Sequence, residues 1–294
     1  MNYLKLGVLA SGNLGLTCIL KLLESTALEF VYTDKHSAGI INICTEKNIP
    51  VFIGNPRKEK AELFIKRFDI DVLLSINYLY LVNSIIYGHP RKFAVNFHGS
   101  LLPKYRGRTP HVWAIINNEQ QTGITAHLMT GECDEGDILY QEVILIDEND
   151  TGADILKKYE KRYPDIVSSI IIMIEDNLVN LLPQNNMEAT YFGKRVPDDG
   201  LINWDWQRER IKNWVRAQAK PYPGAFSYIK NNKVVIHKIE FSNLGFFDTD
   251  PNGKIISIDE LIVVKTPNGA VKLTDIEIEH NINIVVGDIF CESN

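Results

Sequence analysis

Three polar residues in the middle of the sequence have the side-chain types that acyl transfer requires. Asn96 and His98 stand two positions apart at the end of the apolar run FAVNFH, and Asp134 lies in the glycine-flanked acidic segment GECDEGD. Alternate residues of a β-strand point to the same face, so Asn96 and His98 can share one face of a sheet. An amide can stabilise an oxyanion, an imidazole can move or stabilise protons, and a neighbouring carboxylate orients the imidazole and favours its charged form. These three residues are our candidate catalytic residues.

A covalent nucleophile is not evident beside these residues. Ser100 is close in sequence, but it lacks the G-x-S-x-G turn that exposes a nucleophilic serine. Cys133 stands between acidic residues, which raise the pKa of a thiol and argue against a thiolate. The residues therefore favour direct attack by a bound amine.

The elements that must position these residues alternate along the first hundred positions. Short apolar runs and segments of helical periodicity predict strands at 4–10, 30–32, 49–54, 71–76 and 93–98, and helices at 14–23, 38–47 and 58–68. This alternation predicts an α/β fold, an open and mostly parallel Rossmann-like sheet with helices on both faces. Right-handed crossovers would place the strand ends, and Asn96 and His98 with them, along the edge where such sheets bind ligands.

The second half of the chain changes texture after residue 203. Before that point we expect a helix at 108–118, strands at 125–129 and 138–143, and a helix at 153–178 interrupted at Pro164. One amphipathic helix around 211–218 is followed by β-like runs separated by turn residues, at 234–241, 255–258, 261–266, 271–278 and 282–290. We therefore divide the chain into a catalytic domain, 1–203, and a small β-rich domain with its linking helix, 204–294, resembling an OB-type barrel.

Two further sites are candidates for phosphate contacts. Ala10 to Gly15 follows a strand and opens a helix, and Asp34 comes about 20 residues later, a spacing close to the dinucleotide fingerprint. The segment can be a tight turn, a phosphate cradle using Gly12 and Asn13, or an NAD site. Lys194-Arg195 can likewise contact a diphosphate or belong to a solvated linker.

Composition excludes several classes of protein. The 294 residues are 45% hydrophobic and 23% charged with a net charge of −6, which excludes disorder, collagen and coiled coils and does not favour nucleic acid. The four cysteines have no CxxC or CxxH spacing, so we expect neither a disulfide framework nor a metal site. The sequence shows no signal peptide and no apolar run of membrane-spanning length. We expect a cytoplasmic protein that does not bind membranes.

Several motifs resemble those of a known family. NFHGSLLPKYRG, TGITAHLM and CDEGDIL are similar to the formyltransferases that use N10-formyltetrahydrofolate. YFGKRVPDDGLINW and RAQAKPYPGAFSY are similar to the transformylase domain that formylates UDP-4-amino-4-deoxy-arabinose, and to N-formyltransferases of nucleotide-linked 4-amino-4,6-dideoxy sugars. The resemblance covers residues 1–230, and the remainder matches in its β-rich character.

The resemblance implies catalytic roles for Asn96, His98 and Asp134. It also implies folate contacts at Tyr80, Leu81, Val82, Arg108, Thr130, Gly131, Glu132, Cys133 and Asp134. Tyr80 to Val82 could instead be core residues, and Arg108 a plain surface arginine. The implied reaction is formyl transfer from N10-formyltetrahydrofolate, without a metal, to the amine of a nucleotide-linked amino sugar. The product would serve cell-surface polysaccharide or lipopolysaccharide biosynthesis such as O-antigen, and the family implies a homodimer.

Two alternatives remain open at this point. A methionyl-tRNA formyltransferase would share the fold. From residue 248 onward, however, the sequence contains nine acidic residues and only three lysines, and this negative charge would repel tRNA. An NAD-dependent dehydrogenase or other dinucleotide-binding protein would use Ala10 to Gly15 and Asp34, and it leaves the three candidate catalytic residues without a role.

Overall fold

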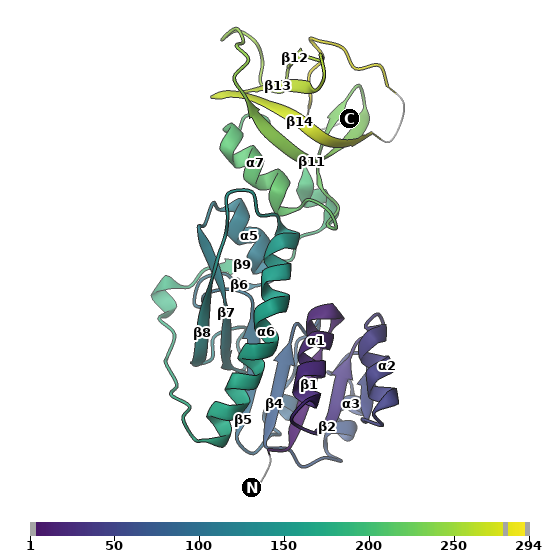
Figure 1. The fold of residues 1–294 in the computed structure, drawn as a ribbon, viewed down its shortest axis with the longest axis vertical. Helices are drawn as coiled ribbons and strands as arrows, with labels where there is room; N and C mark the ends of the chain where they lie inside the picture. Colours follow the sequence, from purple (N-terminus) through teal and green to yellow (C-terminus); the bar gives the residue numbers. More distant parts are fainter. Residues whose placement is uncertain (1–3, 279–281, 292–294) are drawn as a thin grey trace. The chain divides into compact units, whose positions relative to one another are not determined.

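The chain folds into two compact units. The structure, a computed structural model, describes residues 4–278 and 282–291 (Figure 1). The first unit consists of Met1–Pro110, Thr122–Leu145 and Lys157–Phe192, and the second of His111–Gln121, Ile146–Leu156 and Gly193–Asn294. This grouping differs from the expected division at 203/204, because two earlier pieces of chain pack with the C-terminal part. For example, the Trp113 indole donates to the Gly193 carbonyl, and the Asn213 amide donates to Asn118.

A seven-stranded sheet forms the centre of the first unit. Its order is β3-β2-β1-β4-β5-β7-β8. The strands are β1 (Leu6–Ala10), β2 (Leu28–Thr33), β3 (Val51–Ile53), β4 (Val72–Ile76), β5 (Phe93–His98), β7 (Gln121–Leu128) and β8 (Ile138–Leu145). Strands β1 to β5 run parallel, and β7 is antiparallel to β5. The predicted open, mostly parallel sheet is confirmed.

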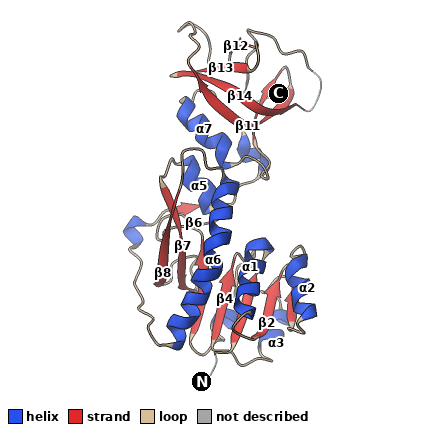
Figure 2. Ribbon diagram, in the orientation of Figure 1, coloured by secondary structure: helices blue, strands red, loops and turns tan. Residues whose placement is uncertain are grey.

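Helices cover both faces of this sheet (Figure 2). They are α1 (Gly12–Leu23), α2 (Ala38–Glu46), α3 (Glu59–Ile65), α4 (Ser84–Tyr87) and α6 (Gly152–Glu175). Buried residues of α3 and α4 pack with Phe30 and Tyr32 of β2 in one apolar cluster. Helices α1 and α6 lie in front of the sheet in Figure 1, with the α1 residues Cys18 and Ile19 buried. Burying apolar surface on each side stabilises the sheet and fixes where its strands end.

Helix α6 corrects one expectation. We expected an interruption at Pro164, but the helix runs unbroken from Gly152 to Glu175. Proline removes one backbone hydrogen bond and normally breaks a helix. Here the apolar face is buried on both sides of the proline, at Tyr159 and Tyr163 before it and at Val167 after it. Tertiary packing of that face therefore holds the helix through the defect.

Two short elements join distant parts of the first unit. Strand β6 (Arg106–Gly107) pairs in parallel with β9 (Tyr191–Phe192). The segment leading to β9 leaves the end of α6 and contains a single turn of 3₁₀ helix, η1 (Asn186–Glu188). It bridges the sheet edge where Leu182 pairs with Ile138.

The second unit contains a five-stranded antiparallel sheet of order β10-β11-β14-β13-β12. Its elements are α5 (Pro110–Ile116), the 3₁₀ turn η2 (Pro197–Gly200), α7 (Arg208–Ala217), β10 (Ala225–Ile229), β11 (Asn232–Ser242), β12 (Ile255–Ser257), β13 (Ile262–Thr266) and β14 (Gly269–Ile278). Ile211 and Val215 of α7 are buried in the core of this sheet. The predicted small β-rich C-terminal part is confirmed.

The prediction of a β-strand at 282–290 is wrong. Residues 282–290 form no strand, and the chain there makes single bridges, Ile289 to Lys254 and Cys291 to Tyr228. Gly287 adopts φ +96° and the Asp288 carboxylate accepts the Val285 N–H, so this part of the run is a turn. Among the described residues, no helix has both the length and the apolar character needed to cross a membrane.

Candidate active site

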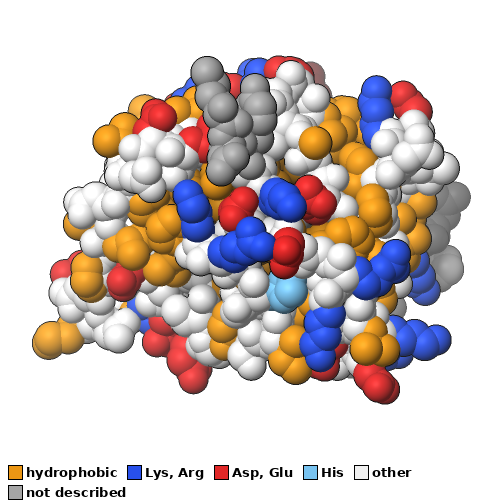
Figure 3. Space-filling model, turned by 90° about the horizontal axis from the view of Figure 1, so that it is seen from below, with side chains coloured by type: hydrophobic (Ala, Val, Ile, Leu, Met, Phe, Trp, Pro, Cys, Tyr) orange, Lys and Arg blue, Asp and Glu red, His pale blue; other side chains and the backbone are white. Residues whose placement is uncertain are grey.

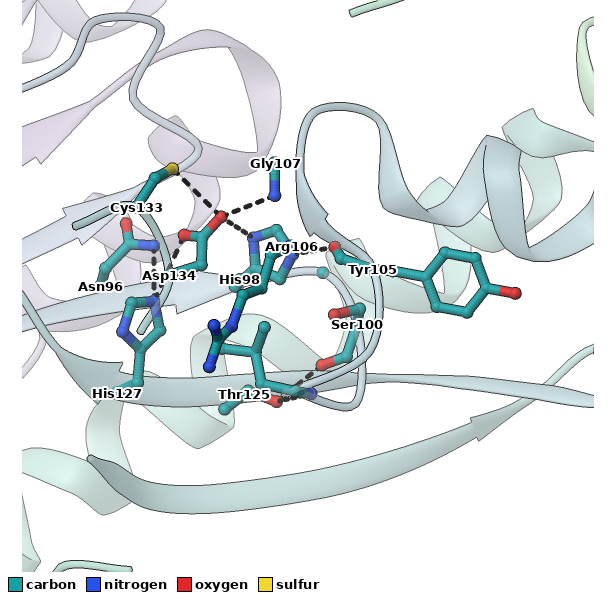
Figure 4. A network of polar contacts seen from close by, with 12 residues as sticks. Asn96, His98, Ser100, Tyr105, Arg106, Gly107, Thr125, His127, Cys133 and Asp134 are labelled. Atoms are coloured by element: carbon teal, nitrogen blue, oxygen red, sulfur yellow. Dashed lines mark hydrogen bonds and ion pairs between the residues drawn. The ribbon is translucent and has the colours of Figure 1, made fainter. Parts of the chain in front are cut away.

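Asn96 and His127 face each other across the antiparallel pair β5 and β7. Their Cα atoms are register partners, and the Asn96 side-chain amide donates to His127 Nε2 at 3.0 Å (Figure 4). His127 Nδ1 donates to its neighbour's carbonyl, Leu128 O, at 2.8 Å. A neutral imidazole with its proton on Nδ1 presents Nε2 as an acceptor, which suits the Asn96 donor. One amide hydrogen of Asn96 is engaged in this way, and the second can point at a ligand.

Asp134 lies between the two histidines. Its Oδ2 is 3.6 Å from His98 Nδ1, and its Oδ1 is 3.5 Å from His127 Nε2. The Gly107 N–H donates to Oδ2 at 2.8 Å, and the Cys133 thiol donates to the same oxygen at 3.4 Å. The structure thus brings together all three candidate catalytic residues and adds His127 to them.

His98 is buried and held in one orientation. Its Nε2–H donates to the Tyr105 carbonyl at 2.8 Å, so in the neutral ring Nδ1 carries the lone pair and faces Asp134. Burial lowers the pKa of His98, and the negative charge of Asp134 opposes this only in part. His98 is therefore neutral near pH 7 and can accept a proton at Nδ1, where Asp134 would stabilise the resulting cation.

Asp134 remains ionised in this environment. Burial alone would raise the pKa of its carboxyl group, but the positive charge that His98 carries when protonated and the hydrogen bond from the Gly107 N–H hold that pKa well below its usual range. Although Cys133 as a whole residue is exposed, partial desolvation of its sulfur and then the Asp134 carboxylate raise the pKa of the thiol to about 12. This agrees with the expectation that Cys133 is not a nucleophile.

Two glycines allow backbone segments to pack closely around Asp134. Asp134 adopts the left-handed conformation with φ +60°, and at Gly136 a Cβ would collide with the Leu128 carbonyl oxygen. Gly107 adopts φ +103°, and a Cβ there would collide with the Phe192 carbonyl oxygen. Both glycines allow backbone segments to approach so closely that the Gly107 N–H reaches the Asp134 carboxylate.

The loop after β4 contains three of the residues for which we predict folate contacts. Tyr80 and Val82 are half-buried, whereas Leu81 is 53% exposed. Val82 packs against the apolar cluster of α3 and α4, so it has the core role weighed above, while Leu81 presents its side chain to solvent. The loop therefore offers apolar surface that a ligand could cover.

The other predicted folate residues lie in the same unit. The exposed Arg108 guanidinium donates to the Leu79 carbonyl at 3.0 Å, which ties it to the β4 loop. The segment that precedes Asp134 is exposed and consists of Thr130, Gly131, Glu132 and Cys133. A Cβ on Gly131 would lie 3.7 Å from the Tyr87 hydroxyl of α4, and Arg108 is near enough to influence the Cys133 thiol. Their contact with folate stays a prediction.

The first loop is exposed at the start of α1. Gly12 adopts φ +66° and its N–H donates to Ser37 Oγ at 2.9 Å, while Asn13 donates to Glu160 at 2.9 Å. Asp34 is buried and accepts from Ser37 Oγ at 2.6 Å. Asp34 thus positions Ser37, whose hydroxyl oxygen accepts the first backbone N–H of helix α1. This arrangement agrees with the interpretation of the loop as a tight turn. A substrate contact at Gly12 and Asn13 stays a prediction.

Lys194 and Arg195 belong to the second compact unit. Lys194 is exposed. The Arg195 guanidinium lies over the rings of Trp113 and Trp214, 4.9 and 4.5 Å from their centroids. It also donates to the Gln218 side chain at 3.0 Å. These contacts give Arg195 a packing role, and a diphosphate contact stays a prediction.

Sequence reasoning missed several residues that organise the site. His127 is not among the predicted site residues, yet it contacts both Asn96 and Asp134. The available signal was that His127 lies in a predicted strand, 125–129, close in sequence to the other candidate residues. Arg106 stands in the motif NFHGSLLPKYRG, but nothing in the sequence indicates its burial, and Gln184 belongs to no motif. Residues 4–278 and 282–291 contain no group of three His, Cys, Asp or Glu side chains that could hold a metal ion.

Comparison with known proteins defines the class to which this fold and site belong. The formyl transferase family matches residues 25–171, and the formyl transferase C-terminal domain matches residues 194–294. The chain therefore belongs to the formyl transferase family, and it is an enzyme of formyl-group transfer.

Individual relatives narrow the comparison. The bifunctional polymyxin resistance protein ArnA of Wigglesworthia glossinidia brevipalpis is 36% identical over 261 residues, which are 86% of this chain and 39% of that protein. The chain thus spans about two fifths of the length of this relative. An N-formyltransferase from Helicobacter canadensis, solved with folinic acid and dTDP-3-aminofucose, has a TM-score of 0.74 and 20% identity over 92% of this chain and 98% of its own. Methionyl-tRNA formyltransferase from Clostridium thermocellum has a TM-score of 0.62 and 18% identity over 95% and 100%.

Proposed function

We propose that this enzyme transfers a formyl group from N10-formyltetrahydrofolate to the amine of a nucleotide-linked amino sugar. The observation that carries the proposal is the Asp134 carboxylate held between His98 and His127, beside Asn96, in a unit that also presents the exposed apolar Leu81 and the loop before Asp134. The Helicobacter canadensis structure binds folinic acid and a dTDP-amino sugar, which supports both ligand classes.

The side chains suggest how the reaction would proceed. The neutral amine attacks the formyl carbon, forming the new C–N bond, and the free Asn96 N–H donates to the oxyanion that develops. His98 Nδ1 takes the proton that the amine nitrogen loses, and ionised Asp134 stabilises the imidazolium. The bond to N10 then breaks, and the same proton passes from His98 to N10, so that tetrahydrofolate leaves neutral at that atom.

The finer assignment follows the sugar branch of the family. The motifs YFGKRVPDDGLINW and RAQAKPYPGAFSY, which resemble those of sugar N-formyltransferases, support a 4-amino-4-deoxy or 4-amino-4,6-dideoxy sugar and a place in lipopolysaccharide or other cell-surface polysaccharide synthesis. The four cysteines without disulfide spacing fit a cytoplasmic enzyme, and a homodimer is the assembly that the family resemblance implies.

Transfer to methionyl-tRNA is the second candidate, because an enzyme of that class shares the fold. The charged residues of the protein argue against tRNA as the acceptor. In the loops of the C-terminal part Lys254 pairs with Asp250 at 2.6 Å and Lys230 with Asp288 at 2.8 Å, so these cations are already neutralised. On the face shown in Figure 3, the described Lys and Arg side chains lie scattered beside Asp and Glu and do not form one basic patch. Binding a phosphate backbone requires clustered cations.

A thermal-shift screen separates these classes of ligand. Folinic acid, and either UDP or dTDP, should each raise the unfolding temperature at millimolar concentration, because a ligand that binds the folded state stabilises it. NAD should leave it unchanged. A shift with NAD and none with folinic acid would contradict the proposal.

A further inference from the structure

The segment after α6, residues 177–192, runs back along the sheet to β9 (Figure 1), and one of its side chains contacts the loop that contains Asp134. We call it the return segment. It is anchored at one end by two backbone hydrogen bonds between Leu182 and Ile138 at 2.8 and 3.0 Å, and at the other by β9. Its middle contains Gln184, whose side chain reaches the Asp134 loop.

Every polar atom of the Gln184 side chain is engaged. Its amide nitrogen donates to the Asp134 carbonyl at 2.8 Å and to the Gly136 carbonyl at 2.7 Å. Its oxygen accepts from the Arg106 guanidinium, from Nε at 3.2 Å and from Nη2 at 2.8 Å. A carboxamide has two hydrogens and one carbonyl oxygen, so a single side chain binds both carbonyls that flank Glu135 and is itself held by a cation.

Arg106 is fully buried. An arginine is rarely buried unless its guanidinium is paired, and this guanidinium has several partners. Besides Gln184, its guanidinium donates to Asn186 Oδ1 at 2.7 Å and to the Tyr191 hydroxyl, and it lies 3.1 Å from the Glu135 carboxylate. The return segment and the Asp134 loop therefore both contact the buried guanidinium of Arg106. Its planar fork can satisfy several acceptors at once, which an ammonium group cannot do in the same geometry.

The network holds Asp134 from two sides. Gly107, the neighbour of Arg106, donates its N–H to the Asp134 carboxylate, while Gln184 binds the Asp134 main-chain carbonyl. Asp134 has φ +60°, a conformation that costs a residue with a Cβ about 1 kcal/mol and persists where the surroundings impose it. Removing the Gln184 donors would let this turn relax and would move the carboxylate relative to His98.

We propose that Gln184 is a positioning residue for formyl transfer: held by buried Arg106, its carboxamide fixes the left-handed turn at Asp134 and so sets the distance between the Asp134 carboxylate and His98. The inference rests on the proposed role of Asp134 in the reaction. A displacement of the order of 1 Å at a reacting group can cost about 10²-fold in rate, which is the scale of effect expected here.

The sharpest test is Gln184→Glu. The substitution keeps the size of the side chain and the oxygen that Arg106 binds, but it turns an oxygen toward the Asp134 and Gly136 carbonyls in place of the N–H donors. The matched control is Met187→Ala on the same return segment, because Met187 is 95% exposed. The wild type is first assayed with N10-formyltetrahydrofolate and either UDP-4-amino-4-deoxy-arabinose or a dTDP-linked 4-amino-4,6-dideoxy sugar, and the acceptor that it formylates is then used throughout.

We expect Gln184→Glu to lower kcat about 10- to 100-fold, while the KM for the acceptor and the folinic acid Kd change less than about threefold. Met187→Ala should match the wild type in all three. A purely structural role would instead lower the amount of folded enzyme and leave its kcat intact. If Gln184→Glu does not fold, Gln184→Met serves, because it removes the donors without opposing two carbonyls and should lose kcat in the same direction.

Asp134→Asn, assayed in parallel, separates this inference from the function on which it rests. Wild-type kcat in a folded Gln184 variant, with Asp134→Asn inactive, would overturn the positioning role and leave the function standing. Wild-type kcat in Asp134→Asn would overturn both. No formylation of any sugar acceptor by the wild type would instead contradict the proposed function.

Discussion

The Asn96 amide and the His127 imidazole are joined by a 3.0 Å hydrogen bond across β5 and β7. The bond exists because the two residues are register partners in an antiparallel pair, so their side chains leave the sheet on the same face. It fixes the rotation of the amide, and with it the direction of the second N–H. A donor whose orientation is set before the substrate arrives costs no reorganisation during the reaction, which is how an oxyanion site lowers a barrier.

Replacing His98 with asparagine should remove the proton acceptor and keep the fold. The expected loss of kcat is about 10² to 10⁴-fold, the usual contribution of a positioned proton-transfer group. Steady-state kinetics with circular dichroism of the variant checks this. A folded His98→Asn enzyme with near-wild-type turnover would remove His98 from the reaction.

Activity should rise with pH through the neutral range. Burial lowers the pKa of His98, and the contacts of the Asp134 carboxylate lower the pKa of Asp134. Near neutral pH His98 is therefore already neutral and Asp134 already ionised. Raising the pH then mainly deprotonates the acceptor amine, whose neutral form attacks, and kcat/KM should increase. The measurement is a pH profile from about pH 6 to 9. A steady fall across that range with the enzyme still folded would contradict attack by a free amine.

Asp134→Asn should damage catalysis more than folate binding. The side chains are nearly equal in size, and asparagine keeps an oxygen to accept the Gly107 N–H, so the loop should keep its shape. Asparagine carries no charge and cannot stabilise protonated His98, so kcat should fall about 10² to 10⁴-fold. Calorimetry with folinic acid should show a much smaller change in Kd. An equal loss of both would make Asp134 a ligand-positioning residue instead.

Gly136→Ala should destabilise the first unit. The new Cβ would collide with the Leu128 carbonyl oxygen, and backbone movement of this kind costs about 1–3 kcal/mol. Gly131→Ala is the matched control in the same loop, because its Cβ would find Tyr87 at an ordinary 3.7 Å. Urea unfolding of both variants measures the difference. Equal free energies of unfolding for the two would show that the Asp134 loop is not as tightly packed as described.

Much of the fold could be read from the sequence because its signals are local. The alternation of apolar runs and helical periodicity predicts strands β1 to β5 and helices α1 to α3, but not the single turn of α4 between β4 and β5. Asn96 and His98 could be found because strand alternation places both on one face. Pro164 shows the limit, since a local helix breaker was overruled by the buried face of α6. The apolar run at 282–290 failed for the opposite reason, because Gly287 and Asp288 form a turn within it.

The rest of the site depends on contacts between distant residues. His127 meets Asn96 through strand register, which a single sequence does not specify. Gln184 lies 50 positions from Asp134 in a segment without periodicity, and a glutamine there has nothing to distinguish it. Arg106 stands inside a recognisable motif, but its burial under the return segment is visible only in the folded chain.

The central claim is tested most directly by incubating the enzyme with N10-formyltetrahydrofolate and following each acceptor by mass spectrometry. The acceptors are a panel of UDP- and dTDP-linked amino sugars and, in parallel, initiator methionyl-tRNA. We predict a gain of about 28 Da, one formyl group in place of one amine hydrogen, on a nucleotide-linked amino sugar, with no formylation of the tRNA. Formylation of methionyl-tRNA at a rate comparable to that of any sugar would contradict the account.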